Sequence, residues 1–213
     1  MHNFQREFLQ LAIEQQVLGF GSFKLKSGRI SPYFFNSGRY SDGRSLSAIG
    51  RCYAGAIVAS SLEFDMIFGP AYKGIPLGVM VCGALYEHHG LNIPFAYNRK
   101  ESKDHGEGGN IVGAALAGRV LVLDDVISAG TSMRESIRWI TDAGAEIAGL
   151  AIALDRQERG SGPLSAVQEL EHEYAISVIS IVNLDELIHF LDQRNSGDID
   201  LPAIRAYRDT YGI

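Results

Sequence analysis

Short apolar runs alternate with amphipathic helical patterns through the middle of the chain, and this alternation limits the possible folds more than any other feature. Strand-like runs occur at 65–69, 94–98, 119–124, 147–154 and 175–182, and helical patterns at 74–89 and 131–143 lie between them. Short apolar strands that alternate with helices are typical of a parallel sheet buried on both faces. We therefore predict an α/β fold whose mostly parallel, doubly wound sheet is flanked by helices and spans residues from about 64 to 182.

The segments outside this alternation predict a smaller unit beside the sheet. A helical pattern starts at its expected N-cap, Asn3, and continues through Leu18 until Gly19 stops it. Alternating aromatic residues at 22–35 predict a β-hairpin, and further helices are expected at 46–62, 184–191 and 204–211. We expect residues 1–213 to form a single domain in which about 1–40 contribute a hood subdomain over the carboxyl edge of the sheet, where α/β proteins bind ligands.

Composition argues against several classes of protein. The 19 basic and 25 acidic residues give a net charge of -6, which disfavours non-specific binding to nucleic acid. The longest uncharged apolar stretch, between Lys73 and Glu87, is shorter than the roughly 20 residues of a membrane span. The N-terminus shows no cationic region followed by an apolar core, and Cys52 and Cys82 lie among apolar residues as expected of free thiols. We expect a cytoplasmic protein that binds neither nucleic acid nor membranes.

The most informative motif follows the apolar run that begins at Val120. Two carboxylates, Asp124 and Asp125, end the run, a loop of small residues follows, and a helix is expected from Thr131. Free N–H groups and the positive end of the helix dipole make such a loop a site for phosphate. The carboxylates suit sugar hydroxyls or a divalent cation held through water, so together the motif fits a pentose phosphate. The ordinary alternative is a strand end whose Asp residues cap the next helix.

These residues resemble the signature by which type I phosphoribosyltransferases bind phosphoribosyl diphosphate (PRPP). Segments 24–29, 31–36, 69–76, 98–109 and 155–159 extend the resemblance over nearly the whole chain, to the short bacterial branch of the family that uses orotate. The resemblance implies transfer of the 5-phosphoribosyl group from PRPP to orotate, which gives orotidine 5′-monophosphate and diphosphate in de novo pyrimidine (UMP) biosynthesis. Two alternatives stay open, a purine-base phosphoribosyltransferase and a non-catalytic regulator that senses PRPP.

The resemblance also assigns roles to individual residues. Those implied in catalysis are Lys73, Arg99, Lys103, His105, Asp124 and Asp125. Those implied in PRPP binding are Lys26, Tyr72, Lys73, Arg99, Lys100, Lys103, His105, Asp124, Asp125, Val126, Ile127, Ser128, Ala129, Gly130, Thr131 and Ser132. Those implied around orotate are Lys26, Phe34, Phe35, Ser128 and Arg156. Many members of the family have Thr where this chain has Ser128, and we expect little effect because the hydroxyl is kept.

Several of these assignments compete with simpler explanations. Segment 69–74 also fits an ordinary turn with a solvated Lys73, although the resemblance implies a strained peptide at Ala71-Tyr72 and a diphosphate contact. Arg156 also fits a solvated surface residue, whereas a ligand role would pair its planar fork with the orotate carboxylate through two hydrogen bonds. Phe34 and Phe35 are adjacent in an expected strand, so their side chains should point to opposite faces of the hairpin.

The charged, Gly-rich segment 99–109 fits either a solvated loop or a lid. A lid of this kind can close over a diphosphate and exclude water during the reaction. The resemblance implies that Lys103 and His105 reach the neighbouring subunit's site, so we expect a homodimer whose 99–109 lids act across the interface. It also implies Mg²⁺ as cofactor, held through substrate oxygens and water near Asp124 and Asp125 instead of by protein ligands alone.

Overall fold

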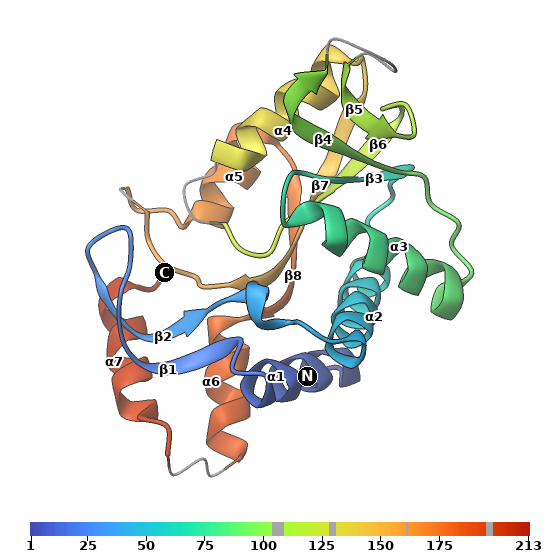
Figure 1. Cartoon of the computed structure of the whole chain (residues 1–213). Helices are drawn as coiled ribbons and strands as arrows, with labels where there is room; N and C mark the ends of the chain where they lie inside the picture. The colour runs from blue at the N-terminus through green and yellow to red at the C-terminus, as the bar shows by residue number, and fades with distance from the viewer. Residues whose placement is uncertain (104–108, 128–130, 161, 195–197) are drawn as a thin grey trace.

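The computed structural model describes residues 1–103, 109–127, 131–160, 162–194 and 198–213 (Figure 1). Its central sheet has six strands in the order β5-β4-β3-β6-β7-β8. The strands are β3 (Met66–Gly69), β4 (Phe95–Lys103), β5 (Gly109–Gly113), β6 (Arg119–Leu123), β7 (Glu146–Asp155) and β8 (Ser177–Asn183). All neighbouring pairs are parallel except β4 and β5, which confirms the predicted mostly parallel α/β sheet.

The strand order reverses direction between β3 and β6. From β3 the chain moves outward to β4 and β5, and from β6 it moves the other way to β7 and β8. At such a switch point the loops that follow the two central strands separate and leave a crevice at the carboxyl edge. The fold therefore creates one preferred position for a ligand, next to the loops after Gly69 and Leu123.

Alternating residues of the central strands enter two apolar clusters, one on each face of the sheet. Ile67 and Leu121 face α2 (Gly43–Ser60) and α3 (Gly74–His89), whereas Phe68 and Val122 face α4 (Thr131–Asp142) and α5 (Ala166–Tyr174). Figure 1 shows these two pairs of helices on opposite sides of the sheet. Burial on both faces explains why the strands appear in the sequence as continuous apolar runs.

A separate two-stranded antiparallel sheet pairs β1 (Leu18–Lys24) with β2 (Ile30–Phe35). It packs against α1 (Asn3–Glu14) and α7 (Leu201–Tyr211), and α6 (Leu184–Gln193) lies beside α7 (Figure 1). A single 3₁₀ turn, η1 (Ser37–Arg39), then leads into α2, whose N-cap Asp42 accepts a hydrogen bond from Ser45 N at 2.8 Å. The predicted hairpin is confirmed, and its exit leads the chain back toward the large sheet.

Some expected boundaries were wrong. The first helix ends at Glu14, and Leu18 begins β1. The backbone of Leu18 pairs with Phe35 in the antiparallel sheet and so cannot also continue the helix. The N-cap of that helix is His2, not Asn3. Strand β4 continues to Lys103, so the first residues of the expected 99–109 loop belong to a strand, and Lys103 pairs with Gly109 of β5 after an irregularity in the register. The remainder of that loop, 104–108, lies outside the described residues.

Two further expectations concern membranes and thiols. Within the described ranges, no helix is both long and apolar enough to cross a membrane. Cys52 and Cys82 are both free, with Cys52 fully buried, which confirms the expected state of the thiols.

Gly69 provides a test of the packing that shapes the crevice. A Cβ added at Gly69 would lie 2.1 Å from the carbonyl oxygen of Gly74, where only backbone movement could relieve the clash. We expect Gly69→Ala to lower the free energy of unfolding by about 2–3 kcal/mol, measured by urea or thermal unfolding. Gly43→Ala is the matched control, because a Cβ at Gly43 meets nothing within 4 Å. Equal stability of the two variants would contradict the packing described here.

Candidate active site

An ion pair joins the loops that follow β3 and β6 at the switch point. Nζ of Lys73 lies 2.7 Å from Oδ2 of Asp125, and the hydroxyl of Ser37 donates to the same oxygen. The other oxygen of Asp125 accepts the backbone N–H of Val126 at 3.0 Å. Asp125 is buried, whereas the Lys73 side chain is 60% exposed. A ligand in the crevice can therefore reach the cation, and the carboxylate keeps Ser37 and the Val126 N–H as donors if Lys73 moves to that ligand.

Asp124 is held by the strand that precedes it. Its backbone N–H donates to Ala151 O at 3.0 Å, and its carbonyl accepts the hydroxyl of Tyr53 at 2.8 Å. The carboxylate accepts the N–H of Asp125 at 2.8 Å. Burial, together with the negative charge of Asp125, raises the pKa of Asp124 to about 7. The pair of acids therefore combines one carboxylate that is firmly ion-paired with one that titrates near neutral pH.

The loop between β3 and α3 is held from the neighbouring strand β4. Oδ1 of Asn98 accepts the backbone N–H of Ala71 at 2.9 Å, and the Ala71–Tyr72 peptide is cis. Tyr72 is exposed, and Nζ of Lys100 lies 4.8 Å from the centre of its ring. Asn98 was not among the predicted site residues, although a polar residue that directly follows an apolar strand at the carboxyl edge was a usable signal.

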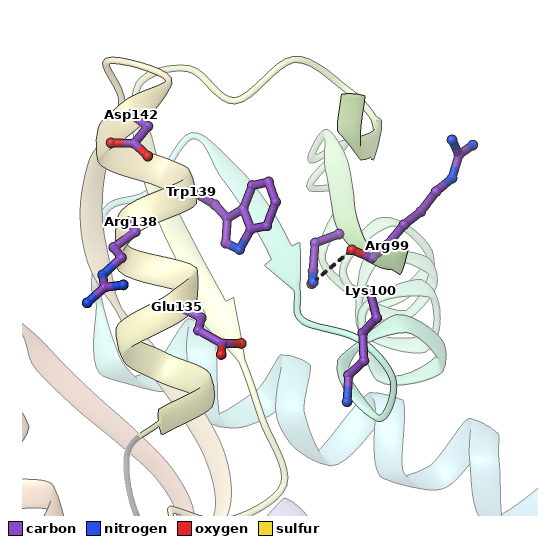
Figure 2. Close-up of a pocket in the computed structure, with 7 residues that line it drawn as sticks. Arg99, Lys100, Glu135, Arg138, Trp139 and Asp142 are labelled. Carbon is purple, nitrogen blue, oxygen red and sulfur yellow. Dashed lines mark hydrogen bonds between the residues drawn. The ribbon is translucent and has the colours of Figure 1, made fainter. Parts of the chain in front are cut away.

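A pocket of about 570 Å³ opens between β4 and α4, beside this loop. Figure 2 shows Trp139 and Glu135 directed from α4 toward β4, with Arg99 and Lys100 leaving β4 in different directions. The lining residues are Asn98, Arg99, Lys100, Glu135, Arg138, Trp139 and Asp142. The four residues from α4 were missed because a charged helix face is more often simply solvated.

The three predicted orotate residues of the small sheet differ in exposure to solvent. Lys26 is exposed in the turn between β1 and β2, and Phe34 is exposed with its ring 5.7 Å from that of Phe23. Phe35 points to the opposite face, where it is 7% exposed and packs 6.1 Å from Phe8. The opposite facing is confirmed, and the Phe35 side chain belongs to the core instead of to a ligand surface.

Arg156 emerges after β7 and is already engaged. Its Nε donates to Oε1 of Glu158 at 2.8 Å and its Nη2 donates to Ser31 Oγ at 3.0 Å, while the guanidinium lies 4.2 Å from the centre of the Tyr33 ring. The interpretation of Arg156 as a solvated surface residue was wrong, because its side chain is 17% exposed. Two of the three guanidinium nitrogens, Nε and Nη2, already have partners within the chain.

Other predicted residues are described only in part. His105, Ser128, Ala129 and Gly130 lie outside the described residues. The backbone of Lys103 ends β4, and the backbones of Thr131 and Ser132 begin α4. Val126 and Ile127 are half-buried where the loop leaves β6. The start of α4 at Thr131 places the first turn of a helix directly after the predicted phosphate loop.

The donor set at the crevice suits a cation that brings most of its own ligands. Among the residues that the structure describes, no cluster of three or more His, Cys, Asp or Glu side chains could hold a metal. Asp124 and Asp125 offer carboxylate oxygen, the donor that Mg²⁺ prefers, but Asp125 is already shared with Lys73. These residues fit a magnesium ion whose remaining positions are filled by substrate and water.

The chain is similar to known proteins over its full length. The model of the phosphoribosyl transferase domain family matches residues 37–181. Proteins named orotate phosphoribosyltransferase from Vibrio vulnificus and Shigella flexneri are each 54% identical over 213 residues, which is 100% of both chains.

Solved structures show the same relationship. The crystal structure of orotate phosphoribosyltransferase from Francisella tularensis has a TM-score of 0.86 at 36% identity and covers 97% of this chain and 99% of that one. An adenine phosphoribosyltransferase from Leishmania donovani has a TM-score of 0.56 at 18% identity, covers 86% of this chain and 81% of that one, and shares the fold alone.

Asp124→Asn tests the electrostatics of the acid pair. Because the folded pKa of Asp124 is about 7 and its ordinary value is 3.8, the native state binds more protons than the unfolded state between these values. Ionisation of Asp124 therefore costs stability as the pH rises through this window, and Asn removes that cost. We therefore expect Asp124→Asn to have a higher free energy of unfolding than wild type. This stabilisation is expected to be about 1–2 kcal/mol larger at pH 8 than at pH 5. Thermal unfolding at both pH values measures this difference, and a gain independent of pH would contradict it.

Proposed function

Because this chain belongs to the orotate phosphoribosyltransferases of the phosphoribosyl transferase family, we propose that PRPP binds at its carboxyl-edge crevice between Lys73 and the Asp124–Asp125 pair. The reaction transfers the 5-phosphoribosyl group from PRPP to orotate and yields orotidine 5′-monophosphate and diphosphate, a step of pyrimidine biosynthesis. The observation that carries the proposal is the 2.7 Å contact of Lys73 with Asp125 at the switch point. There a cation for the diphosphate and acids for the ribose lie side by side.

The proposed orientation of PRPP follows from the chemistry of each wall. The 5′-phosphate lies at the loop that ends in the first turn of α4, where free backbone N–H groups and the helix dipole favour an anion. Asp124 and Asp125 accept ribose hydroxyls. Lys73 and Lys100, which flank Tyr72, lie on the diphosphate side. In this orientation the anomeric carbon of PRPP faces the proposed orotate site.

Charge separation during bond breaking defines what each group does. The bond from the anomeric carbon to the diphosphate breaks, so positive charge develops on the ribose and negative charge on the leaving group. Lys73 leaves Asp125 for the diphosphate and stabilises that charge, and the freed carboxylate lies near the developing sugar cation. A ring nitrogen of orotate attacks the opposite face and loses its proton, which the departing diphosphate can accept, and Arg156 orients the base through its carboxylate. Magnesium, when bound with the diphosphate, adds further neutralisation of the leaving group.

We also infer a homodimer in which the 99–109 lid acts in the neighbouring subunit's site. Two observations support this. Arg99 and Lys100 diverge from β4 (Figure 2), and Lys100 lies over Tyr72 of its own chain, which leaves Arg99 free to serve another site. Val79 and Tyr86 of α3 and Tyr72 of the loop before it are large exposed side chains, a surface that suits a second copy of the chain. With both thiols free, the proposed compartment is the cytoplasm.

The direct test of the activity is loss of orotate absorbance with purified protein, PRPP and magnesium, with mixtures that lack each component as controls. Loss is expected only in the complete mixture. Adenine and hypoxanthine added in excess should not slow the reaction, since the crevice is proposed to select a carboxylate-bearing pyrimidine. Loss without PRPP, or competition by a purine base, would contradict the assignment.

The lid predicts a pattern of complementation between inactive chains. Lys103→Ala and Lys73→Ala should each lower kcat by roughly a hundredfold or more, because both cations act most strongly in the transition state. In dimers formed by co-expressing the two variants, one site combines an intact Lys73 with an intact lid from the other chain. About a quarter of wild-type activity is therefore expected from an equal mixture. No recovery above the separate variants would show that each lid serves its own chain.

A further inference from the structure

Arg156 is enclosed by a small polar cluster that none of the assigned roles explains. Glu158 lies two residues along the chain, and Ser31 and Tyr33 come from β2 of the small sheet. Ser31 and Tyr33 are fully buried, and the Glu158 side chain is 14% exposed. An acid this close to a proposed binding site for an anion is unfavourable for that anion, so its presence calls for a specific role.

The donors of the guanidinium are divided unequally. Arginine has one N–H at Nε and two at each terminal nitrogen. Nε donates to Oε1 of Glu158 at 2.8 Å, and the two N–H groups of Nη2 go to Glu158 Oε1 and to Ser31 Oγ. Among the hydrogen bonds of the described residues, none uses Nη1 of Arg156, and the buried hydroxyl of Tyr207 is a further polar group that interacts with Arg156 and with Glu158. The side edge of the guanidinium is therefore occupied, and its remaining donors are at Nη1.

The cluster is rigid on both sides of the guanidinium. The ring of Tyr33 lies flat beneath it at 4.2 Å, and the Tyr33 hydroxyl donates to the same Oε1 of Glu158 at 3.4 Å. Ser31 in turn donates to the carbonyl of Tyr33 at 2.7 Å, which fixes the orientation of its own oxygen. One carboxylate oxygen of Glu158 thus receives Arg156 twice and Tyr33 once.

The backbone of Glu158 is anchored by the C-terminal segment. It forms a β-bridge with Gly212, and the neighbouring residues Arg159 and Gln157 bond to the backbone of Tyr211 and Ile213 at 2.9 and 3.1 Å. From the other side, Arg29 of the β1–β2 turn donates to Arg159 O at 2.8 Å. The acid that holds Arg156 is therefore tied to α7 and to the small sheet.

We propose that Glu158 is a positioning residue for orotate binding, which holds the side edge of Arg156 so that Nη1 is the donor presented to the carboxylate of the substrate. The inference rests on the proposed function, in which Arg156 receives that carboxylate. The inference adds that the carboxylate of orotate binds Arg156 at Nη1. It also adds that the position of the acceptor oxygen of Glu158, more than its charge, determines the affinity for orotate. Glu158 does not touch the substrate.

Two substitutions separate geometry from charge. Glu158→Ala removes every acceptor from Nε and is expected to raise the KM for orotate roughly tenfold or more. Glu158→Gln keeps a carbonyl oxygen at the position of Oε1, so its orotate KM is expected to stay within about threefold of wild type. The KM for PRPP is expected to stay within about twofold in both variants, because Lys73 and the acid pair are unchanged. Steady-state kinetics with each substrate varied in turn gives all four values.

The same experiment contains the contradicting results. An unchanged orotate KM in Glu158→Ala, an equal rise in both KM values, or a fall in orotate KM in Glu158→Gln would overturn the proposal. Glu173→Ala, which breaks the 2.7 Å ion pair between Glu173 of α5 and Arg134 of α4, is the matched control and should leave both KM values unchanged. If Glu158→Ala shows no cooperative thermal unfolding, Glu158→Asp replaces it, since the shorter side chain withdraws the acceptor and should also raise the orotate KM.

A double-mutant cycle with Arg156→Ala distinguishes the inference from the function on which it rests. If Glu158 acts through Arg156, Glu158→Ala adds less than about a twofold change in orotate KM once Arg156 is absent. Additive effects would overturn the positioning role alone. An unchanged orotate KM in Arg156→Ala itself would instead contradict the proposed contact between Arg156 and orotate.

Discussion

One carboxylate oxygen, Oδ2 of Asp125, connects three parts of the molecule. It receives Lys73 from the loop after β3 and Ser37 from the segment that leaves the small sheet, while Asp125 itself ends β6. A buried carboxylate is tolerated only when it is paired and hydrogen-bonded. The contact is possible because the parallel arrangement of β3 and β6 brings their carboxyl ends to the same edge. The contact fixes the position of Lys73 and links the segment that leaves the small sheet to the end of β6.

Both substrates in the proposed reaction are anions, although the chain carries a net charge of -6. Two of the cations that are proposed to contact these anions form ion pairs within the chain. Lys73 is paired with Asp125, and Arg156 is paired with Glu158. The two pairs differ in exposure. Lys73 is 60% exposed and can exchange its partner for a diphosphate, whereas Arg156 is 17% exposed and enclosed. One pair is therefore suited to movement during the reaction and the other to recognition without movement.

Sequence patterns predicted the parts of the fold that depend on burial. The strands around Ile67, Leu121 and Leu150 were found because both faces of the sheet are covered, which makes them apolar throughout. The strand residues 99–103 were missed because they are polar. Strand β5 at the sheet edge was missed because its apolar run is only two residues long, Ile111 and Val112. Helix α5 was also missed, since it buries little more than Leu170.

The site shows the same division between local and long-range information. The acid pair was predicted because it directly follows an apolar strand, a position that the sequence itself marks, whereas Lys73, in the loop after β3, was predicted from the resemblance. Glu158 was not found, because its partner Tyr33 lies 125 residues away in the sequence and nothing in a charged run indicates burial. The burial of the Phe35 side chain could not be predicted for a similar reason, since its contact with Phe8 exists only in the folded chain.

The most direct test of this account is a crystal structure of the protein with PRPP and magnesium. It should place the diphosphate within hydrogen-bonding distance of Lys73 Nζ, the ribose hydroxyls on Asp124 and Asp125, and the 5′-phosphate at the first turn of α4. Lys73 should have left Asp125. PRPP bound elsewhere, or bound in the crevice with the Lys73–Asp125 pair intact, would contradict the central role given to that contact.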